Sequence, residues 1–133
     1  MRFKVDEEFL DRKKTFAVVG ASENKEKWGF KVYASLRNSG FKVFGVNPNC
    51  HAIEGEKCYP NLKSLPEKPD IVITVVPPSV TEEIVKETKE LGIKRVWMQP
   101  GSESEKAIEF CRRNNISVVA NSCFLITHKD VLK

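Results

Sequence analysis

The chain has little of what reactive, metal-binding or membrane-spanning proteins require. No apolar run approaches the ~20 residues that span a bilayer. The four cysteines, at positions 50, 58, 111 and 123, contain no Cys-x-x-Cys pair, and their spacing is irregular. The first residues are charged and lack the apolar stretch of a secretion signal. We therefore expect a cytoplasmic protein with no membrane segment, whose cysteines are reduced thiols.

Two classes of partner have weak support in the composition. Cys50, His51 and Cys58 lie close together, but a fourth metal ligand would have to come from far along the chain, so no metal site is expected. The net charge is only +4, and no run of Lys and Arg interleaved with aromatic residues is present. We expect no binding to nucleic acid, although a mild positive charge would help to attract a phosphorylated ligand.

What the chain does contain is an alternation of strand and helix patterns within a length that suits one core. It has 133 residues, of which 41% are hydrophobic. Strands are expected at 16–19, 42–47, 70–76, 95–98 and 117–120, and helices at 5–14, 28–38, 79–91 and from 102 onward. The pattern predicts one doubly wound α/β Rossmann-like domain over residues 1–133, with a five-stranded parallel sheet in the order 3-2-1-4-5. Both tryptophans, Trp28 and Trp97, are expected in the core.

The most informative segment is 15–22, Thr-Phe-Ala-Val-Val-Gly-Ala-Ser. A short apolar run ends on Gly20, a small residue and a hydroxyl, and a helix pattern follows at about Trp28. Gly20 permits a tight turn, and the start of a helix offers unpaired N–H groups to an anion. The segment therefore predicts a phosphate-binding loop, although a plain turn between strand and helix has the same residues.

The residues after the other expected strands favour binding over reaction. These ends hold Ser, Asn, Gln, Pro and Gly, with Glu23 as the only carboxylate and no histidine. The second strand ends on Asn47, where an NAD-binding domain usually has Asp or Glu. The Gly-x-Gly-x-x-Gly pattern is also broken, because Ser22 and Lys25 replace its later glycines and Gly29 comes several residues late.

Four motifs at four strand ends resemble those of a known family. They occur in order, and the resemblance covers residues 14–123. The family is that of the small stand-alone CoA-binding proteins, which are similar to the first domain of the succinyl-CoA synthetase alpha subunit. The motifs are Val-Val-Gly-Ala-Ser at 18–22, Val-Asn-Pro at 46–48, Val-Val-Pro-Pro at 75–78 and Trp-Met-Gln-Pro-Gly at 97–101.

The resemblance implies a Rossmann-type domain that holds coenzyme A, and the residues themselves point to no catalytic group and no metal site. It implies a phosphate cradle of Gly20, Ala21, Ser22, Asn24 and Lys25. It places Val46, Asn47 and Pro48 under the nucleotide, and Val76, Pro77 and Pro78 against the adenine or the pantetheine arm. It places Gln99, Pro100 and Gly101 near the end that bears the thiol. The ligand is then CoA or an acyl-CoA, and a homodimer or a protein partner remains open.

The chain departs from its relatives in three ways. Pro77-Pro78 stands where many small members have an aromatic residue and Arg, and Asn121-Ser122 stands where many have an acidic residue before the last cysteine. The phosphorylated histidine of the synthetase belongs to a further domain, so ligase activity is not implied. Two alternatives stay open: a sensor of NAD(P) or another nucleotide, and a CoA-linked thiol redox protein that uses Cys123, with His128 as its base.

Overall fold

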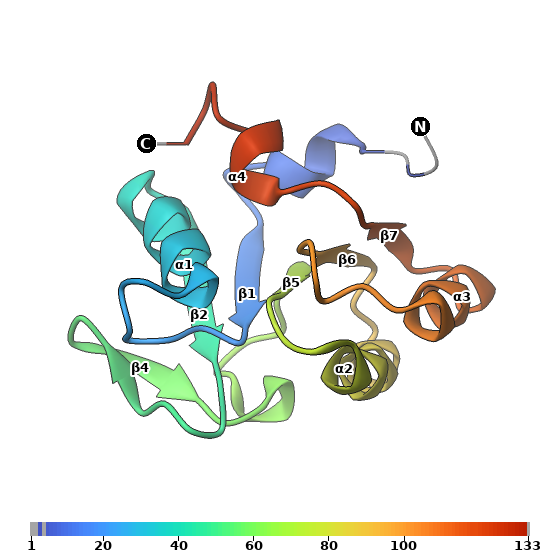
Figure 1. Ribbon diagram of the computed structural model, residues 1–133, viewed down its shortest axis with the longest axis horizontal. Coiled ribbons are helices and arrows are strands. Elements are labelled where there is room, and N and C mark those ends of the chain that lie inside the picture. The colour runs from blue at the N-terminus through green and yellow to red at the C-terminus, as the bar shows by residue number, and fades with distance from the viewer. Residues whose placement is uncertain (1–2, 4, 133) are drawn as a thin grey trace.

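A seven-stranded sheet forms the centre of the molecule in a computed structural model that describes residue 3 and residues 5–132 (Figure 1). The strand order is β3-β4-β2-β1-β5-β6-β7, and every pair is parallel except β3 with β4. The strands are β1 Thr15–Val19, β2 Lys42–Val46, β3 Ala52–Ile53, β4 Glu56–Tyr59, β5 Ile71–Thr74, β6 Arg95–Met98 and β7 Ser117–Val119. The central strands β1 and β5 are buried along their whole length, which explains their continuous apolar sequence.

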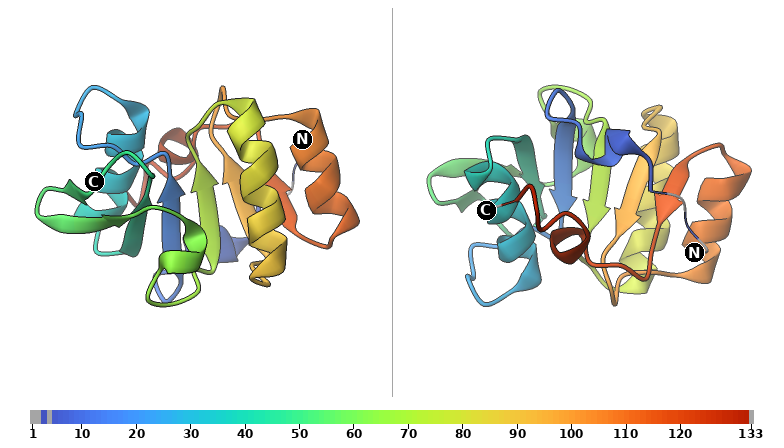
Figure 2. Two further views of the ribbon diagram at one scale, coloured as in Figure 1. Left: turned by 90° about the horizontal axis from the view of Figure 1, so that it is seen from below. Right: turned by 90° about the horizontal axis from the view of Figure 1, so that it is seen from above.

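Helices cover both faces of this sheet (Figure 2). On one face lie α1 (Trp28–Asn38) and the short α4 (Phe124–Thr127); on the other lie α2 (Pro78–Glu90) and α3 (Glu105–Arg113). Two 3₁₀ turns complete the chain, η1 (Glu7–Leu10) and η2 (Leu62–Ser64). The expected Rossmann-like α/β class is confirmed by this arrangement.

The expected number and order of strands are wrong. The five strands foreseen in the sequence correspond to β1, β2, β5, β6 and β7, but their order is 2-1-3-4-5, not 3-2-1-4-5. The reason lies in residues 49–69, which looked irregular and in fact hold the β3–β4 hairpin. Because β4 pairs with the outer edge of β2, through Gly45 with Cys58 and Val46 with Tyr59, that edge is occupied. The chain therefore crosses to the free edge of β1, where β5 pairs.

Three further expectations about elements are corrected. Helix α2 begins at Pro78, with Pro77 as its N-cap, one residue before the expected start at 79. Helix α3 begins at Glu105 and not at the expected residue 102, and its N-cap Ser104 accepts the Ala107 N–H at 3.3 Å through its hydroxyl. The leading helix expected over 5–14 is only the single turn of η1 within the described residues. Both helix starts differ from the expected positions because several residues that favour the start of a helix stand side by side in each segment.

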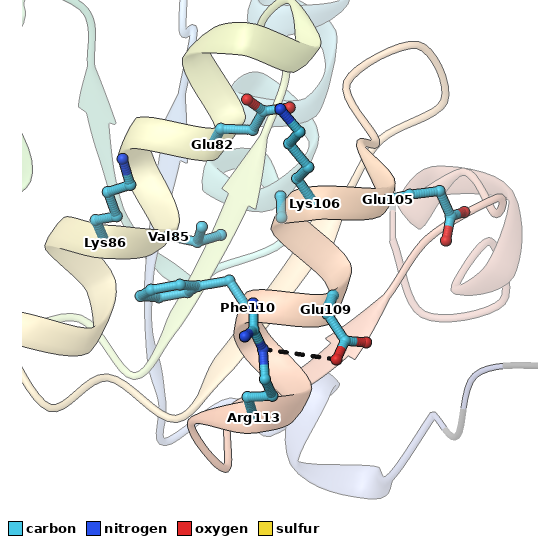
Figure 3. Close-up of a pocket in the computed structure, with 9 residues that line it drawn as sticks. Glu82, Val85, Lys86, Glu105, Lys106, Glu109, Phe110 and Arg113 are labelled. Carbon is cyan, nitrogen blue, oxygen red and sulfur yellow. Dashed lines mark ion pairs between the residues drawn. The ribbon is translucent and has the colours of Figure 1, made fainter.

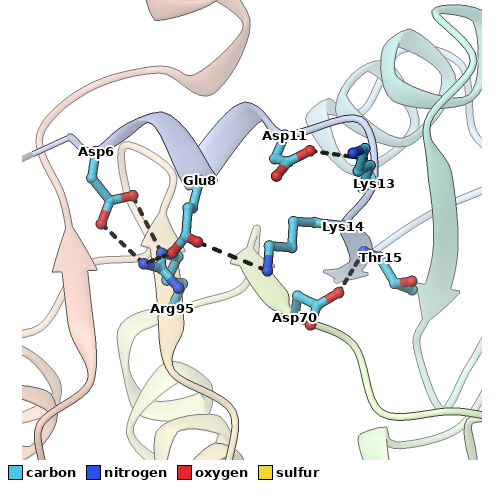
Figure 4. A network of polar contacts seen from close by, with 8 residues as sticks. All are labelled: Asp6, Glu8, Asp11, Lys13, Lys14, Thr15, Asp70 and Arg95. Carbon is cyan, nitrogen blue, oxygen red and sulfur yellow. Dashed lines mark hydrogen bonds and ion pairs between the residues drawn. The ribbon is translucent and has the colours of Figure 1, made fainter.

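An ion network ties the first turn to the amino ends of the central strands (Figure 4). Arg95, at the start of β6, donates two hydrogen bonds of 3.2 Å to the carboxylate of Asp6 and also pairs with Glu8. Nearby, Asp70 accepts the backbone N–H of Thr15 at 2.8 Å. Since these contacts gather at the amino ends of the strands, the opposite edge of the sheet is left for a ligand.

Candidate functional site

A cavity of about 450 Å³ lies beyond the carboxyl ends of β1, β2 and β5. The strand order reverses between β1 and β5, since β2 lies on one side of β1 and the later strands on the other. Parallel α/β sheets bind their ligands at such a reversal, outside the carboxyl ends of the strands. The lining residues are Gly20, Ser22, Glu26, Lys27, Trp28, Gly29, Asn47, Val75, Val76 and Pro77.

Two glycines allow the loop, the first helix and β5 to approach one another at this cavity. Gly20 has φ +98°, and a Cβ there would lie 2.2 Å from the carbonyl oxygen of Val75. A Cβ on Gly29 would lie 1.9 Å from the carbonyl oxygen of Gly20. Gly29 is therefore the glycine that lets the helix start pack on the strand turn, a role the sequence did not reveal because its spacing looked too long.

Asn47 fixes the loop from the neighbouring strand. Its side-chain amide donates to the carbonyl oxygen of Ala21 at 2.9 Å, and its Oδ1 accepts the N–H of Asn49, also at 2.9 Å. Inside the loop, Ser22 Oγ accepts the N–H of Asn24 at 3.0 Å. The side chain of Asn47 thus holds the loop in place. It does not offer a ligand the two free acceptor oxygens that an Asp or Glu would have at this position.

The first turn of α1 presents backbone donors and a cation to the cavity. Helix α1 starts after Lys27, which has no side-chain cap. Within residues 5–132, no acceptor is found for the N–H groups of Ser22, Trp28 or Gly29. Unpaired N–H groups at a helix start, with an ammonium group beside them, bind phosphate or carboxylate groups well.

Five of the residues predicted from the sequence line this cavity, and nine do not. The five are Gly20, Ser22, Asn47, Val76 and Pro77. Of the others, Ala21, Val46 and Gln99 are buried, whereas Asn24, Lys25, Pro48, Pro78, Pro100 and Gly101 are exposed. The lining residues absent from the prediction are Glu26, Lys27, Trp28, Gly29 and Val75. Glu26 is a carboxylate in the long loop between β1 and α1, outside the strand-end motifs on which the predicted site depends.

Gln99 serves the C-terminal segment. Its Oε1 accepts the N–H of Phe124 at 2.6 Å, and its Nε2 donates to Cys123 Sγ at 3.4 Å.

His128 packs its ring 4.4 Å from that of Phe124 and 5.3 Å from that of Trp97, centre to centre. Burial lowers the pKa of His128, and the carbonyl oxygen of Phe124 beside its Nδ1 opposes this shift.

The cysteines are free thiols, and two of them have markedly raised pKa values. Burial raises the pKa of Cys111 to about 12. Burial, helped by the neighbouring Cys50, raises the pKa of Cys58 to about 12 as well. Because the thiolate is the reactive form, these two thiols are unreactive at neutral pH. Among the described residues, no group of three or more His, Cys, Asp or Glu side chains is placed to hold a metal ion.

A larger cavity, of about 650 Å³, lies elsewhere, between α2 and α3 (Figure 3). Its apolar part is formed by Val85, Ala107 and Phe110, and charged side chains surround it, including Arg113 paired with Glu109 at 3.5 Å. These residues come from the flanks of two helices and not from strand ends. We therefore take the smaller cavity at the strand reversal as the functional site, since position in the fold outweighs size. No helix in the described part of the chain is long and apolar enough to cross a membrane.

Fold and site together define a Rossmann-like domain with unpaired backbone N–H groups in a loop at the reversal of its sheet. Residues 14–129 match the model of the CoA binding domain family, and the chain belongs to that family. It is 38% identical over 105 residues to the ADP-forming acetate–CoA ligase II of Archaeoglobus fulgidus, an alignment that covers 75% of the chain and 16% of the ligase. It is 26% identical over 121 residues to the uncharacterized protein YneT of Bacillus subtilis, covering 91% of the chain and 90% of that protein.

Solved structures agree with this assignment. A conserved hypothetical protein from Pyrococcus furiosus superposes with a TM-score of 0.81 at 38% identity, covering 86% of this chain and 98% of that one. The chain spans 16–30% of the length of these archaeal acetate–CoA ligases and ligase subunits. The resemblance noted from the four sequence motifs is therefore confirmed at the level of the family.

Proposed function

We propose that this protein binds coenzyme A, or an acyl-CoA, in the cavity at the carboxyl ends of β1, β2 and β5. In this arrangement the pyrophosphate accepts hydrogen bonds from the N–H groups of Ser22, Trp28 and Gly29, beside the ammonium group of Lys27. The observation that carries the proposal is the coincidence of these donors with a cavity at the strand reversal, in a chain of the CoA-binding family.

The pantetheine arm then runs along the wall formed by Val75, Val76 and Pro77. The two valines are half-buried and Pro77 is exposed, which suits an arm that is partly apolar and partly amide. The described lining includes no histidine and no cysteine, and its single carboxylate is Glu26. These residues support a binding function with no chemistry of their own.

An NAD(P)-type ligand has less support from the site. Such ligands place their ribose hydroxyls on a carboxylate at the end of the second strand. Here that position is Asn47, and its amide is already engaged with Ala21 and Asn49. Titration of NADH against the CoA-loaded protein separates the two ligands: we expect no displacement of CoA by NADH.

Isothermal titration calorimetry with CoA tests the proposal directly. Reversing the charge of Lys27 in Lys27→Glu places a carboxylate beside the phosphates, and we expect CoA to bind about 10-fold more weakly or worse. The matched control is Lys94→Glu, which makes the same charge change on an exposed residue at the amino end of β6. We expect its affinity to stay within about twofold of the unmodified protein, since the interaction is screened over that distance. No heat with millimolar CoA, or equal effects of the two variants, would contradict the proposal.

A further inference from the structure

The two tryptophans have opposite environments. Trp97 is fully buried, with its indole N–H donating to the carbonyl oxygen of Ser122 at 2.8 Å. Trp28 is 53% exposed, so the expectation that both belong to the core is wrong for Trp28. An isolated exposed tryptophan leaves a large flat apolar surface in water, and this one lies in the lining of the candidate cavity.

The surroundings of Trp28 define what it could hold. Lys31, one turn further along α1, places its Nζ 4.8 Å from the centre of the Trp28 ring. A cation over one face orients the indole and leaves the other face for a planar ligand group. The N–H groups of Trp28 and Gly29, which bind no acceptor within residues 5–132, lie on the same turn. A phosphate site and a flat aromatic surface are thus adjacent, as a nucleotide requires.

We propose that Trp28 is the platform on which the adenine ring of the bound ligand stacks. The inference rests on the proposed function for the identity of the ligand, but it goes further by orienting that ligand: the adenosine end lies at the start of α1 and the pantetheine arm leaves past β5. It assigns the adenine to Trp28, and leaves Val76 and Pro77 to the arm. Stacking is the chemistry that fits, because every purine offers a flat face and an exposed indole offers another.

Intrinsic fluorescence tests the orientation, because Trp97 is shielded and Trp28 is the exposed emitter. We expect CoA and ADP, which both contain adenine, to quench the unmodified protein, and 4′-phosphopantetheine, which lacks it, to leave the emission nearly unchanged. In Trp28→Phe, where Trp97 is the remaining indole, we expect the quenching by CoA to disappear.

Affinity supplies the second measurement. We expect Trp28→Ala to bind CoA about 10-fold more weakly by calorimetry, and Trp28→Phe to keep most of the affinity because it keeps a ring. The control is Ile126→Ala, which removes another exposed apolar side chain, 67% exposed on α4, and should bind CoA normally. Thermal melting of each variant checks that the fold is retained.

The outcomes separate the two proposals. If Trp28→Ala binds CoA as tightly as the unmodified protein, and CoA does not quench the fluorescence of the unmodified protein, the stacking platform is refuted and CoA binding stands. If CoA produces no heat but ADP binds and quenches Trp28, the platform stands and the choice of CoA is refuted. If neither ligand produces heat or quenching, both proposals are overturned.

Discussion

Gly29 shows how a single residue can be present in the sequence and still be misinterpreted. The glycine pattern of dinucleotide-binding loops looked broken, because the second glycine position holds Ser22 and the third holds Lys25. In the structure the loop is longer, and Gly29 performs the close packing of helix against strand turn at its own, later position. A glycine motif with fixed spacing recognises loops of one length only. The physical requirement is that the backbone of the helix start lies close to that of the turn after β1, and a loop of another length can also meet it.

We expect Gly29→Ala to destabilise the protein, by about 1–3 kcal/mol, because its Cβ collides with the Gly20 carbonyl oxygen. The sign of the change in unfolding free energy shows whether the collision occurs. Without a collision, Ala would stabilise the helix relative to Gly by about 1 kcal/mol. Urea unfolding followed by circular dichroism measures the change. Ser35→Ala, on the same helix, is the matched control and should be neutral or slightly stabilising. A stabilised Gly29→Ala would mean that the helix start does not rest on the Gly20 turn.

Residue by residue, the sequence predicted part of the cavity lining, and it missed the residues that the start of α1 contributes. Gly20, Ser22 and Asn47 line the cavity because their local signals, a tight turn and polar strand ends, are sufficient to place them. Lys27 and Trp28 were missed although the predicted helix start at Trp28 is correct, because motifs at strand ends do not show that this helix start packs beside them. A large apolar side chain such as that of Trp28 is normally expected in the core, but Trp28 is exposed beside the cavity.

At the scale of elements, Gln99 connects the end of β6 to the start of α4. The sequence resemblance placed Gln99 near the thiol-bearing end of CoA, but in the structure its side chain is hydrogen-bonded to Phe124 and Cys123. Because Gln99 is buried, its oxygen is the acceptor on which the Phe124 N–H depends. A ligand role for Gln99 would require this contact to open.

We expect Gln99→Leu to loosen α4 and to leave CoA affinity nearly unchanged. The substitution leaves the buried Phe124 N–H without its acceptor, which costs about 1–3 kcal/mol. Hydrogen exchange should become faster in residues 122–128 and remain slow in β1 and β5. Cys123→Ala is the control, since it removes only the weak contact to Gln99 Nε2 and should change exchange little. Loss of CoA affinity with α4 still protected would instead favour the ligand role that the resemblance implied.

At the scale of the whole molecule, the class of fold was readable from the sequence and the strand order was not. The five main strands can be predicted because each has its own apolar run, which is a local feature of the sequence. The order depends on which outer edge of the β1–β2 pair is open to β5, and β4 of the short β3–β4 hairpin occupies the edge of β2. Its two strands span only Ala52–Ile53 and Glu56–Tyr59, and they include charged residues, so no periodicity marks them. Because the corrected order moves the reversal to between β1 and β5, it brings Val75 to the cavity as well.

The charge of the whole molecule leads to the last prediction, which concerns salt. The chain carries a net charge of +4, and CoA carries several negative charges on its phosphates. Raising NaCl from about 0.1 to 1 M shortens the screening length from ~10 to ~3 Å, so affinity for CoA should fall. We expect a fall of about 5- to 10-fold, and almost none for pantetheine, which has no phosphate.

Two variants decide whether this salt dependence comes from the molecule's net charge or from the cavity. Lys27→Glu and Lys94→Glu each replace one positive charge by a negative one, and so lower the net charge equally, from +4 to +2. Only Lys27 lines the cavity. If the local field dominates, Lys27→Glu flattens the dependence of CoA affinity on NaCl, while Lys94→Glu retains it. Equal flattening in both variants would show that long-range attraction acts on CoA, and would remove Lys27 from the phosphate site.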